Sequence, residues 1–204
     1  MNVNPYITKI KSSIIKRKYV NDSTHIVITK SIEIDRKKYN IEGEDITING
    51  SAVNSNYESS IGRVYVIGTK PESDLVVMEA DYEKRIQILK SLTSRYLIQS
   101  ALKKYMNLSA INFSTSPKIS SFQINNIFFK NQAEDIKSIL EKVINIYIGF
   151  ALDVKDSDEG KVLIDGIYDG EFIAPHLSNI SEIFNFKIDS YYFANNGIIF
   201  NYSN

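Results

Sequence analysis

The sequence predicts an α+β protein made of two parts, and three patterns carry that prediction. Residues 1–79 contain short stretches of alternating apolar and polar residues, separated by turn signals. Two later segments, which begin near Asp81 and Asn131, place apolar residues at helical spacing. Further strand patterns follow both segments. We therefore expect a small β-barrel-like domain over residues 1–79 and an α+β domain, with an antiparallel sheet and two long helices, over residues 80–204.

The N-terminal part reads as strands joined by tight turns. The stretch THIVITKSIEIDRKKYNI alternates, and so does GRVYVIGTK before its Gly turn. Asn49-Gly50 follows a third short strand pattern and is a strong hairpin signal. The alternating apolar positions are Ile26, Ile28, Ile32, Ile34, Val64 and Val66. Many short strands with such punctuation favour a barrel or a strongly bent sheet.

The C-terminal part begins with a helix pattern over Asp81–Asn107. Strand patterns over residues 109–130 separate it from a second helix, which Asn131 opens, with Glu134 at the spacing of a capping box. The expected buried positions of the two helices are Ile86, Leu89, Thr93, Tyr96, Leu97, Ala101 and Leu102, then Ile136, Ile139, Leu140, Val143 and Tyr147. KVLIDGIYDG and NFKIDSYYFANNGIIFNYS predict further strands, the last two joined at Asn195–Gly197.

Composition excludes several classes of site. The chain has no cysteine and only two histidines, His25 and His176, so a thiolate zinc site, a cysteine nucleophile and a cluster of imidazoles are ruled out. The P-loop, GxSxG and GxGxxG motifs are missing. No apolar run approaches the ~20 residues of a membrane span, and no signal peptide is visible at the N-terminus. We expect a soluble, cytoplasmic protein with no membrane partner.

Charge is balanced overall but unevenly distributed. Residues 1–40 contain nine Lys or Arg against three Asp or Glu, whereas residues 153–182 contain eight acids against two lysines. Two basic triplets in the first region are candidate nucleic-acid contacts: Lys16, Arg17, Lys18, Arg36, Lys37 and Lys38. On alternating strands each triplet would direct at most two charges to one surface. The alternative is a solvated surface that blunts edge strands.

Three segments, in order, give the chain a resemblance to a known family. Asp81-Tyr82-Glu83-Lys84-Arg85, with Thr93 and Leu97-Ile98 after it, resembles the helix D-W-x-R-R-x-x-x-M-R-x-H-T-A-T-H-L-L of the AlaX-type alanyl-tRNA editing proteins. The family shares this helix with the editing domains of alanyl- and threonyl-tRNA synthetases. SSFQINNIFFKNQAEDIKSILEKVINIYI is similar to the strand and helix that follow. FIAPHLSNISEIFNFKI resembles C-G-G-T-H-V-x-N-T-x-E-I-x-x-F-K-I, with matches at His176, Asn179, Glu182 and Ile183.

The resemblance implies an editing-type fold for the second domain but not the family's zinc site. The family's HxxxH pair falls on Leu92 and Tyr96, its cysteine on Phe172, and only the fourth ligand, His176, is retained. The family's GGGQ stretch is also missing. Leucine and phenylalanine offer no donor atoms, and a phenol with a pKa near ~10 is protonated at neutral pH. We therefore expect no metal and no other cofactor, and we favour a cavity filled by Leu92, Tyr96 and Phe172 as core.

Three functions from different classes follow from this combination. The first is a tRNA- or aminoacyl-tRNA-binding homologue, related to translation fidelity, that has lost zinc-dependent deacylation. The second is an altered, metal-independent aminoacyl-tRNA hydrolase in which His176 is the base or orients water, together with Thr93. The third is a non-catalytic scaffold that serves homo-oligomerisation or binds a partner. The amino acid, the tRNA and any residual hydrolase activity are left open by the sequence.

Overall fold

The computed structural model describes residues 4–34, 36–127, 129–172 and 174–204, and it confirms a mixed α and β fold that includes a small closed barrel. The chain divides into two compact units. The first contains the described residues up to Ile34 together with Gly43–Arg85. The second contains the described residues of Asp35–Glu42 together with Ile86–Asn204. This division differs from the expected one because a short segment after Ile34 belongs with the C-terminal unit.

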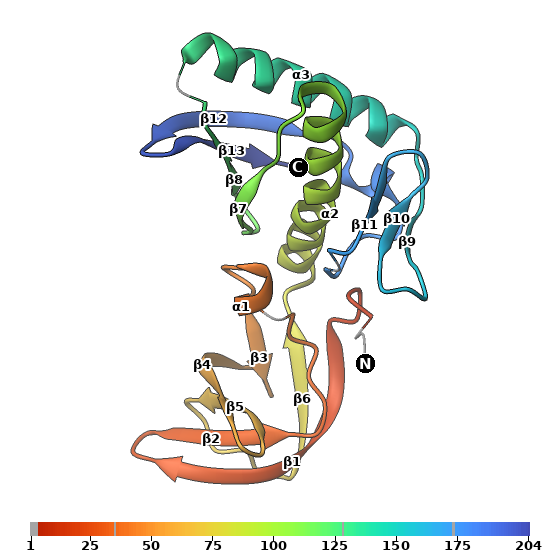
Figure 1. The fold of residues 1–204 in the computed structure, drawn as a ribbon. Coiled ribbons are helices and arrows are strands. Elements are labelled where there is room, and N and C mark those ends of the chain that lie inside the picture. The colour runs from red at the N-terminus through yellow and green to blue at the C-terminus, as the bar shows by residue number, and fades with distance from the viewer. Residues whose placement is uncertain (1–3, 35, 128, 173) are drawn as a thin grey trace. The chain divides into compact units, whose positions relative to one another are not determined.

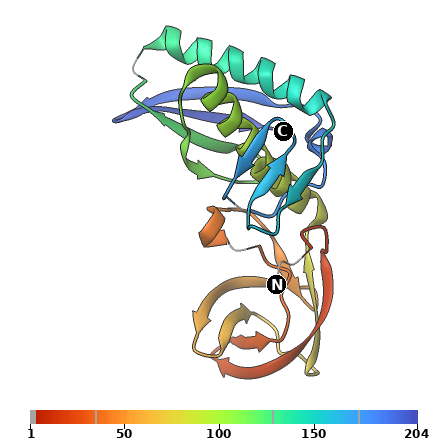
Figure 2. The same cartoon turned by 45° about the vertical axis from the view of Figure 1, so that its right-hand side comes forward.

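The first unit is a barrel of six antiparallel strands in the closed order β1-β2-β5-β4-β3-β6 (Figure 1). Its strands are β1 (Lys9–Val20), β2 (Ser23–Ile28), β3 (Ile46–Ile48), β4 (Ser51–Ser59), β5 (Gly62–Ile67) and β6 (Leu75–Ala80). Figure 2 shows these strands curving into a continuous wall. Strand β1 is long enough to pair with both β2 and β6, which closes the barrel. Ile26, Ile48 and Met78 are fully buried inside it, as the alternating pattern requires.

Local turn chemistry was predictable in this unit, but one extended stretch was not. Asn49 and Gly50 both have positive φ, at 50° and 77°, and join β3 to β4 as predicted. The strand expected to continue through Ile32 and Ile34 is wrong, because the described residues between β2 and β3 contain no strand and the short helix α1 (Arg36–Tyr39) occupies part of the interval. Both isoleucines are nevertheless buried. Burial of alternate residues therefore does not require strand pairing here.

A buried ion pair fixes the start of the long helix α2 (Tyr82–Met106) in the first unit. The guanidinium of Arg85 contacts the carboxylate of Glu44, and both side chains are fully buried. Nη2 of Arg85 also donates to the carbonyl of Ile32 at 2.8 Å. The helix is capped by Asp81, whose carboxylate accepts from the backbone N–H of Lys84 at 3.0 Å.

The second unit contains two antiparallel sheets and the helices α2 and α3 (Lys130–Gly149), as Figure 1 shows. The larger sheet has the order β12-β13-β8-β7 and the smaller one β11-β10-β9. The strands are β7 (Ile111–Ser114), β8 (Ser120–Asn125), β9 (Val154–Asp156), β10 (Val162–Ile164), β11 (Tyr168–Gly170), β12 (Lys187–Ala194) and β13 (Gly197–Ser203). Gly197 is required at the predicted turn before β13, since a Cβ there would lie 2.1 Å from the carbonyl oxygen of Ile124.

Helix caps in this unit correct one expectation. The capping box predicted at Asn131 and Glu134 is wrong: α3 begins one residue earlier, and its N-cap, Phe129, makes no side-chain capping hydrogen bond. Glu134 instead accepts a hydrogen bond from the Tyr191 hydroxyl at 2.6 Å. A capping box does form at the short 3-10 helix η1 (Ile180–Ile183), between Asn179 and Glu182.

Candidate functional site

The segment that follows β11 packs on α2 and brings together three of the predicted metal-site positions. The ring of Tyr96 lies 5.9 Å from that of Phe172 and 6.3 Å from that of His176, measured between centroids. The backbone N–H of Ala174 donates to the Tyr96 hydroxyl at 3.0 Å, and this hydroxyl donates to the Ala174 carbonyl at 3.2 Å. Leu92 is fully buried one turn earlier on α2. The Tyr96 phenol therefore fastens this segment to the helix.

Thr93 and His176, the candidate catalytic pair, are both held by the same packing. The buried Thr93 hydroxyl donates to the Leu89 carbonyl at 2.8 Å and accepts from the Leu177 N–H at 3.0 Å. Nδ1 of His176 lies 2.8 Å from the Leu177 carbonyl oxygen, and Nε2 lies 3.2 Å from Oδ1 of Asp156. Both ring nitrogens thus face acceptors that belong to the protein. No sequence pattern pairs Asp156 with His176, because the two residues meet only in the tertiary fold.

The residues at the four positions do not fit a zinc ion. Leu92 and Phe172 have no donor atoms, and burial raises the pKa of the Tyr96 phenol, which keeps it protonated. Only His176 offers a ligand atom. Across the described ranges, no three His, Cys, Asp or Glu side chains are grouped in a way that could hold a metal ion.

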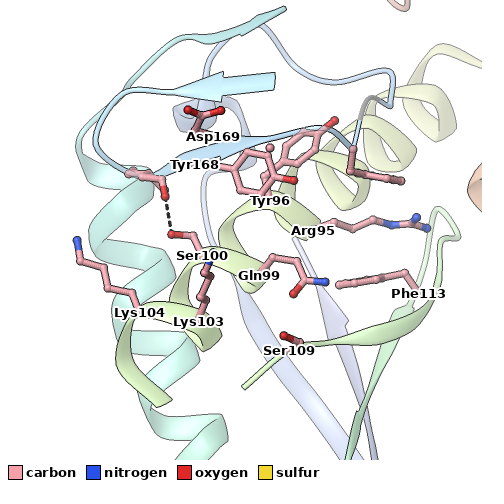
Figure 3. Close-up of a pocket in the computed structure, with 13 residues that line it drawn as sticks. Arg95, Tyr96, Gln99, Ser100, Lys103, Lys104, Ser109, Phe113, Tyr168 and Asp169 are labelled. Atoms are coloured by element: carbon pink, nitrogen blue, oxygen red, sulfur yellow. Dashed lines mark hydrogen bonds between the residues drawn. The ribbon is translucent and has the colours of Figure 1, made fainter. Parts of the chain in front are cut away.

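A groove with a volume of about 720 Å³ runs along α2 beside these positions, within the second unit (Figure 3). Six of its residues are at positions i, i+1, i+4, i+5, i+8 and i+9 of the helix, which form one stripe about 13 Å long. The walls come from the segment before β7, from β7 itself and from β11 with its flanking residues. The lining residues are Arg95, Tyr96, Gln99, Ser100, Lys103, Lys104, Ser109, Phe113, Ile167, Tyr168, Asp169, Gly170 and Phe172.

Arg95, at one end of the groove, is a buried cation with neutral partners. It is 5% exposed, and its Nη2 donates to the Tyr39 carbonyl at 2.7 Å and to the Thr115 hydroxyl. Its guanidinium lies over the ring of Phe113 at 5.2 Å and over that of Phe172 at 6.0 Å. Burial lowers the pKa of Arg95, and its Nε has no hydrogen-bond partner among the described residues. The structure records no ion pair for it there either.

Figure 3 shows Lys103 and Lys104 on α2 toward the other end of the groove, and Asp169 next to Tyr168 on the opposite wall. All three side chains belong to exposed residues. Between the two ends, polar groups on α2 are engaged with the walls. Gln99 exchanges two hydrogen bonds with the backbone of Ala110, and the hydroxyl of Ser100 donates to the Ile167 carbonyl at 2.6 Å. The groove therefore combines walls that are hydrogen-bonded to α2 with three cations and one carboxylate.

Sequence reasoning named only Tyr96 and Phe172 among the groove residues. It predicted one buried apolar stripe on the helix and did not single out the cations beside that stripe. In the structure Ser91, Ser94, Arg95 and Ser100 are buried as well. The sequence signal for this burial is that the residues bordering the apolar stripe of the helix are mostly serines, with a single arginine. This signal is weak unless the elements that form the walls of the groove are known.

The six candidate nucleic-acid residues are divided between the two units. Lys16 and Lys18 are exposed on β1 and line a shallow cavity of about 210 Å³ in the barrel. Arg17 between them donates to the carbonyls of Pro71 and Ser73 and contacts the Asp74 carboxylate, so its charge is compensated. The second triplet lies on a helix and not on the expected alternating strand. Lys37 and Lys38 are exposed there, and the side chain of Arg36 lies outside the described part.

No protein-family model and no curated protein matches the chain, so the resemblance to editing proteins remains a prediction. Within the described residues, no helix combines the length and the apolar character that a membrane span needs.

Proposed function

We propose that the chain is an AlaX-like editing homologue that binds tRNA or aminoacyl-tRNA and has lost zinc-dependent deacylation. The groove along α2 carries this proposal, because it places three cations and several aromatic rings beside the positions that correspond to the family's reaction centre. Cations that track a phosphate backbone, together with rings that stack on bases, are the usual means of binding single-stranded RNA.

The loss of hydrolysis is supported by the chemistry of the former metal positions. Ester hydrolysis needs a positioned water and a group that stabilises the oxyanion. Leu92 and Phe172 can supply neither. The hydroxyl of Thr93 and both nitrogens of His176 are engaged with the protein. The contacts of Thr93 and His176 with other described residues therefore do not favour the alternative of a metal-independent hydrolase based on this pair.

The basic N-terminal region is a second, weaker contribution to RNA binding. Arg17 is compensated by Asp74, whereas Lys16, Lys18, Lys37 and Lys38 are exposed. Neutralising about four phosphates on irregular RNA implies a log–log salt slope of roughly −3.

Titration of unfractionated tRNA at low and moderate salt tests the proposal. We expect weak, salt-sensitive binding that is reduced when the four exposed lysines become Ser. No binding at low salt would overturn the proposal and favour the scaffold function. A deacylation assay on mischarged tRNA, with and without added zinc, is the companion experiment. Zinc-stimulated turnover, or about one zinc per purified chain that is lost in His176→Ala, would refute the loss of the metal reaction.

A further inference from the structure

The larger sheet of the second unit has both helices packed on the same face. The Tyr202 hydroxyl donates to the carbonyl of Ser91 on α2 at 3.1 Å, and the Tyr191 hydroxyl donates to Glu134 on α3 at 2.6 Å. Both tyrosines point to that face, because Tyr191 is paired with Phe200, two residues before Tyr202 on β13. The residues that alternate with them point to the opposite face, which we call the outer face.

The register places the residues of the outer face in rows across the strands. Ile199 on β13 lies opposite Tyr192 on β12 and Gln123 on β8, and Gln123 lies opposite Ile111 on β7. Tyr192 is 53% exposed and Ile111 is 39% exposed, so this row presents aromatic and apolar surface at both of its ends. The next row holds short polar side chains, which are Ser190, Asn201, Ser121 and Ser114.

The outer face differs in charge from another solvent-facing surface of the same unit. Among the described residues of its paired rows, the single charged side chain is that of Lys187, which lies opposite Ser203 at one corner. The exposed residues of α3, by contrast, include Lys130, Glu134, Asp135 and Lys142. Depletion of charge beside aromatic surface is typical of the core of a protein–protein interface.

Hydrogen bonds between side chains of the outer face engage its amides. Asn112 donates to Oε1 of Gln123 at 2.9 Å, and Nε2 of Gln123 donates to Asn125 at 2.9 Å. Asn201 donates to the Ser190 hydroxyl at 2.9 Å. The amides thus use much of their hydrogen-bonding capacity within the sheet. A neutral protein surface therefore suits this face better than a charged or polyhydroxylated ligand.

The edges of the sheet are protected against pairing with another strand. On β12 the register shifts between Ile188 and Ser190, and the ammonium of Lys187 lies 3.8 Å from the Asp189 carboxylate. The other edge strand, β7, has only four residues and an irregular register. Bulges, charges and short edge strands all oppose edge-to-edge pairing. A second sheet would therefore approach the outer face and not an edge.

We propose that the outer face is the contact surface of a homodimer, in which the same face of a second copy packs against it. A two-fold contact places a surface opposite itself, and a neutral surface meets no like charge there. Two sheets that pack in this way lie ~10 Å apart with their strands within about 30° of each other. Ile199 and Gln123, on the two central strands, lie near the axis and close to their counterparts.

The size of the outer face implies a weak, reversible dimer. Four strands of about six residues, spaced ~4.8 Å apart, have a footprint of roughly 400 Å². This footprint is about half of the ~800 Å² per partner that a stable interface buries. The inference goes beyond the proposed function, since none of the residues assigned to tRNA binding belongs to the paired rows of this face.

Sedimentation equilibrium of the full chain over a wide range of protein concentration tests the inference. We expect the average mass to rise from that of one chain toward that of two, and salt should change the dissociation constant little because the face is neutral. Gln123→Glu brings two carboxylates near each other across the axis. It should weaken the dimer about tenfold at low salt, with partial recovery at high salt.

Mixing two charge variants tests the two-fold contact directly. Gln123→Glu and Gln123→Lys should each dimerise poorly, whereas an equimolar mixture should form a heterodimer, because opposite charges then face each other across the axis. The matched controls are Gln132→Glu and Gln132→Lys, the same changes at an exposed residue of α3 outside the outer face. Both controls should dimerise like the natural chain. Circular dichroism of each variant verifies that the fold is retained.

Several results would overturn the inference. A natural chain that stays monomeric at every concentration excludes the second copy as the occupant of the face. A dimer that the changes at Gln123 and Gln132 affect equally uses another surface. Two weakened Gln123 variants that fail to associate on mixing contradict the two-fold contact. Titration with tRNA separates the two proposals: a dimer that binds no tRNA supports this inference and refutes the proposed function, whereas a monomer that binds tRNA does the reverse.

Discussion

Arg85 and Arg95 are both buried on α2, yet only Arg85 has an anionic partner for its charge. Arg85 has the carboxylate of Glu44 as its partner, and the pair is fully enclosed in the first unit. Arg95 belongs to the second unit, and its partners are a carbonyl, the hydroxyls of Thr115 and Tyr202 and two aromatic rings, none of which is a carboxylate. Burial lowers the pKa of both guanidinium groups.

The difference separates a structural ion pair from an electropositive site. When a buried cation has a carboxylate partner, the two charges largely cancel and the electrostatic potential around the pair is small. A buried cation without such a partner makes the local potential more positive, because the medium around it has a low dielectric constant. The groove that Arg95 lines also contains Lys103 and Lys104. The contrast therefore indicates a packing role for the start of α2 and supports the proposed ligand-binding role of its middle and end.

The largest expected effect is that of breaking the first pair. Arg85→Met leaves the Glu44 carboxylate buried without its cation, and we expect the free energy of unfolding to fall by about 3–5 kcal/mol. The double variant Arg85→Met, Glu44→Leu should recover most of this loss, because it removes both charges. Urea denaturation measures the two values. Equal losses in the single and double variants would show that the pair is held by packing and not by charge.

The elements on which this comparison depends were predictable to different degrees. The α2 bounds were predicted within a residue at each end, because Asp81 is a strong cap and the apolar spacing persists to Leu102. The hairpins at Asn49-Gly50 and before Gly197 were predicted from turn chemistry alone. These features depend on residues that are close together in the sequence.

The groove was not predictable for a physical reason. Its walls come from residues near Phe113 and Tyr168, which are far from Arg95 in the sequence and reach α2 only through the tertiary fold. Periodicity also fails for α2 because hydrogen bonds allow its polar residues to be buried: Ser94 donates to Asn204 at 2.7 Å, and Ser120 donates to Ser91 at 2.9 Å. An amphipathic sequence pattern identifies the buried residues only of a helix that has one solvated face, and α2 is buried on more than one face.

The next effect concerns Leu92, which lies between the two arginines on α2. Both Leu92 and Phe172 were expected to fill the former metal cavity as core. Leu92 is fully buried, so Leu92→Ala should cost about 2–5 kcal/mol in unfolding free energy. Phe172 is 40% exposed and lines the groove, so Phe172→Ala should cost about 1 kcal/mol, less than a buried aromatic would. Thermal or urea denaturation of the two variants compares them directly, and equal losses would contradict the open groove.

Arg95→Met should have a smaller effect on stability than Arg85→Met, although the side chain of Arg95 is nearly as buried. The substitution leaves the Tyr39 carbonyl and the Thr115 hydroxyl without their donor, which costs about 1–3 kcal/mol. It also removes a desolvated cation that has no carboxylate partner, and replacing buried charge by an apolar side chain of similar volume is often favourable. The two contributions oppose each other, so we expect a net loss below about 2 kcal/mol in urea denaturation. A loss as large as that of Arg85→Met would mean that an acid neutralises Arg95 in solution, and the electropositive character of the groove would then have to be abandoned.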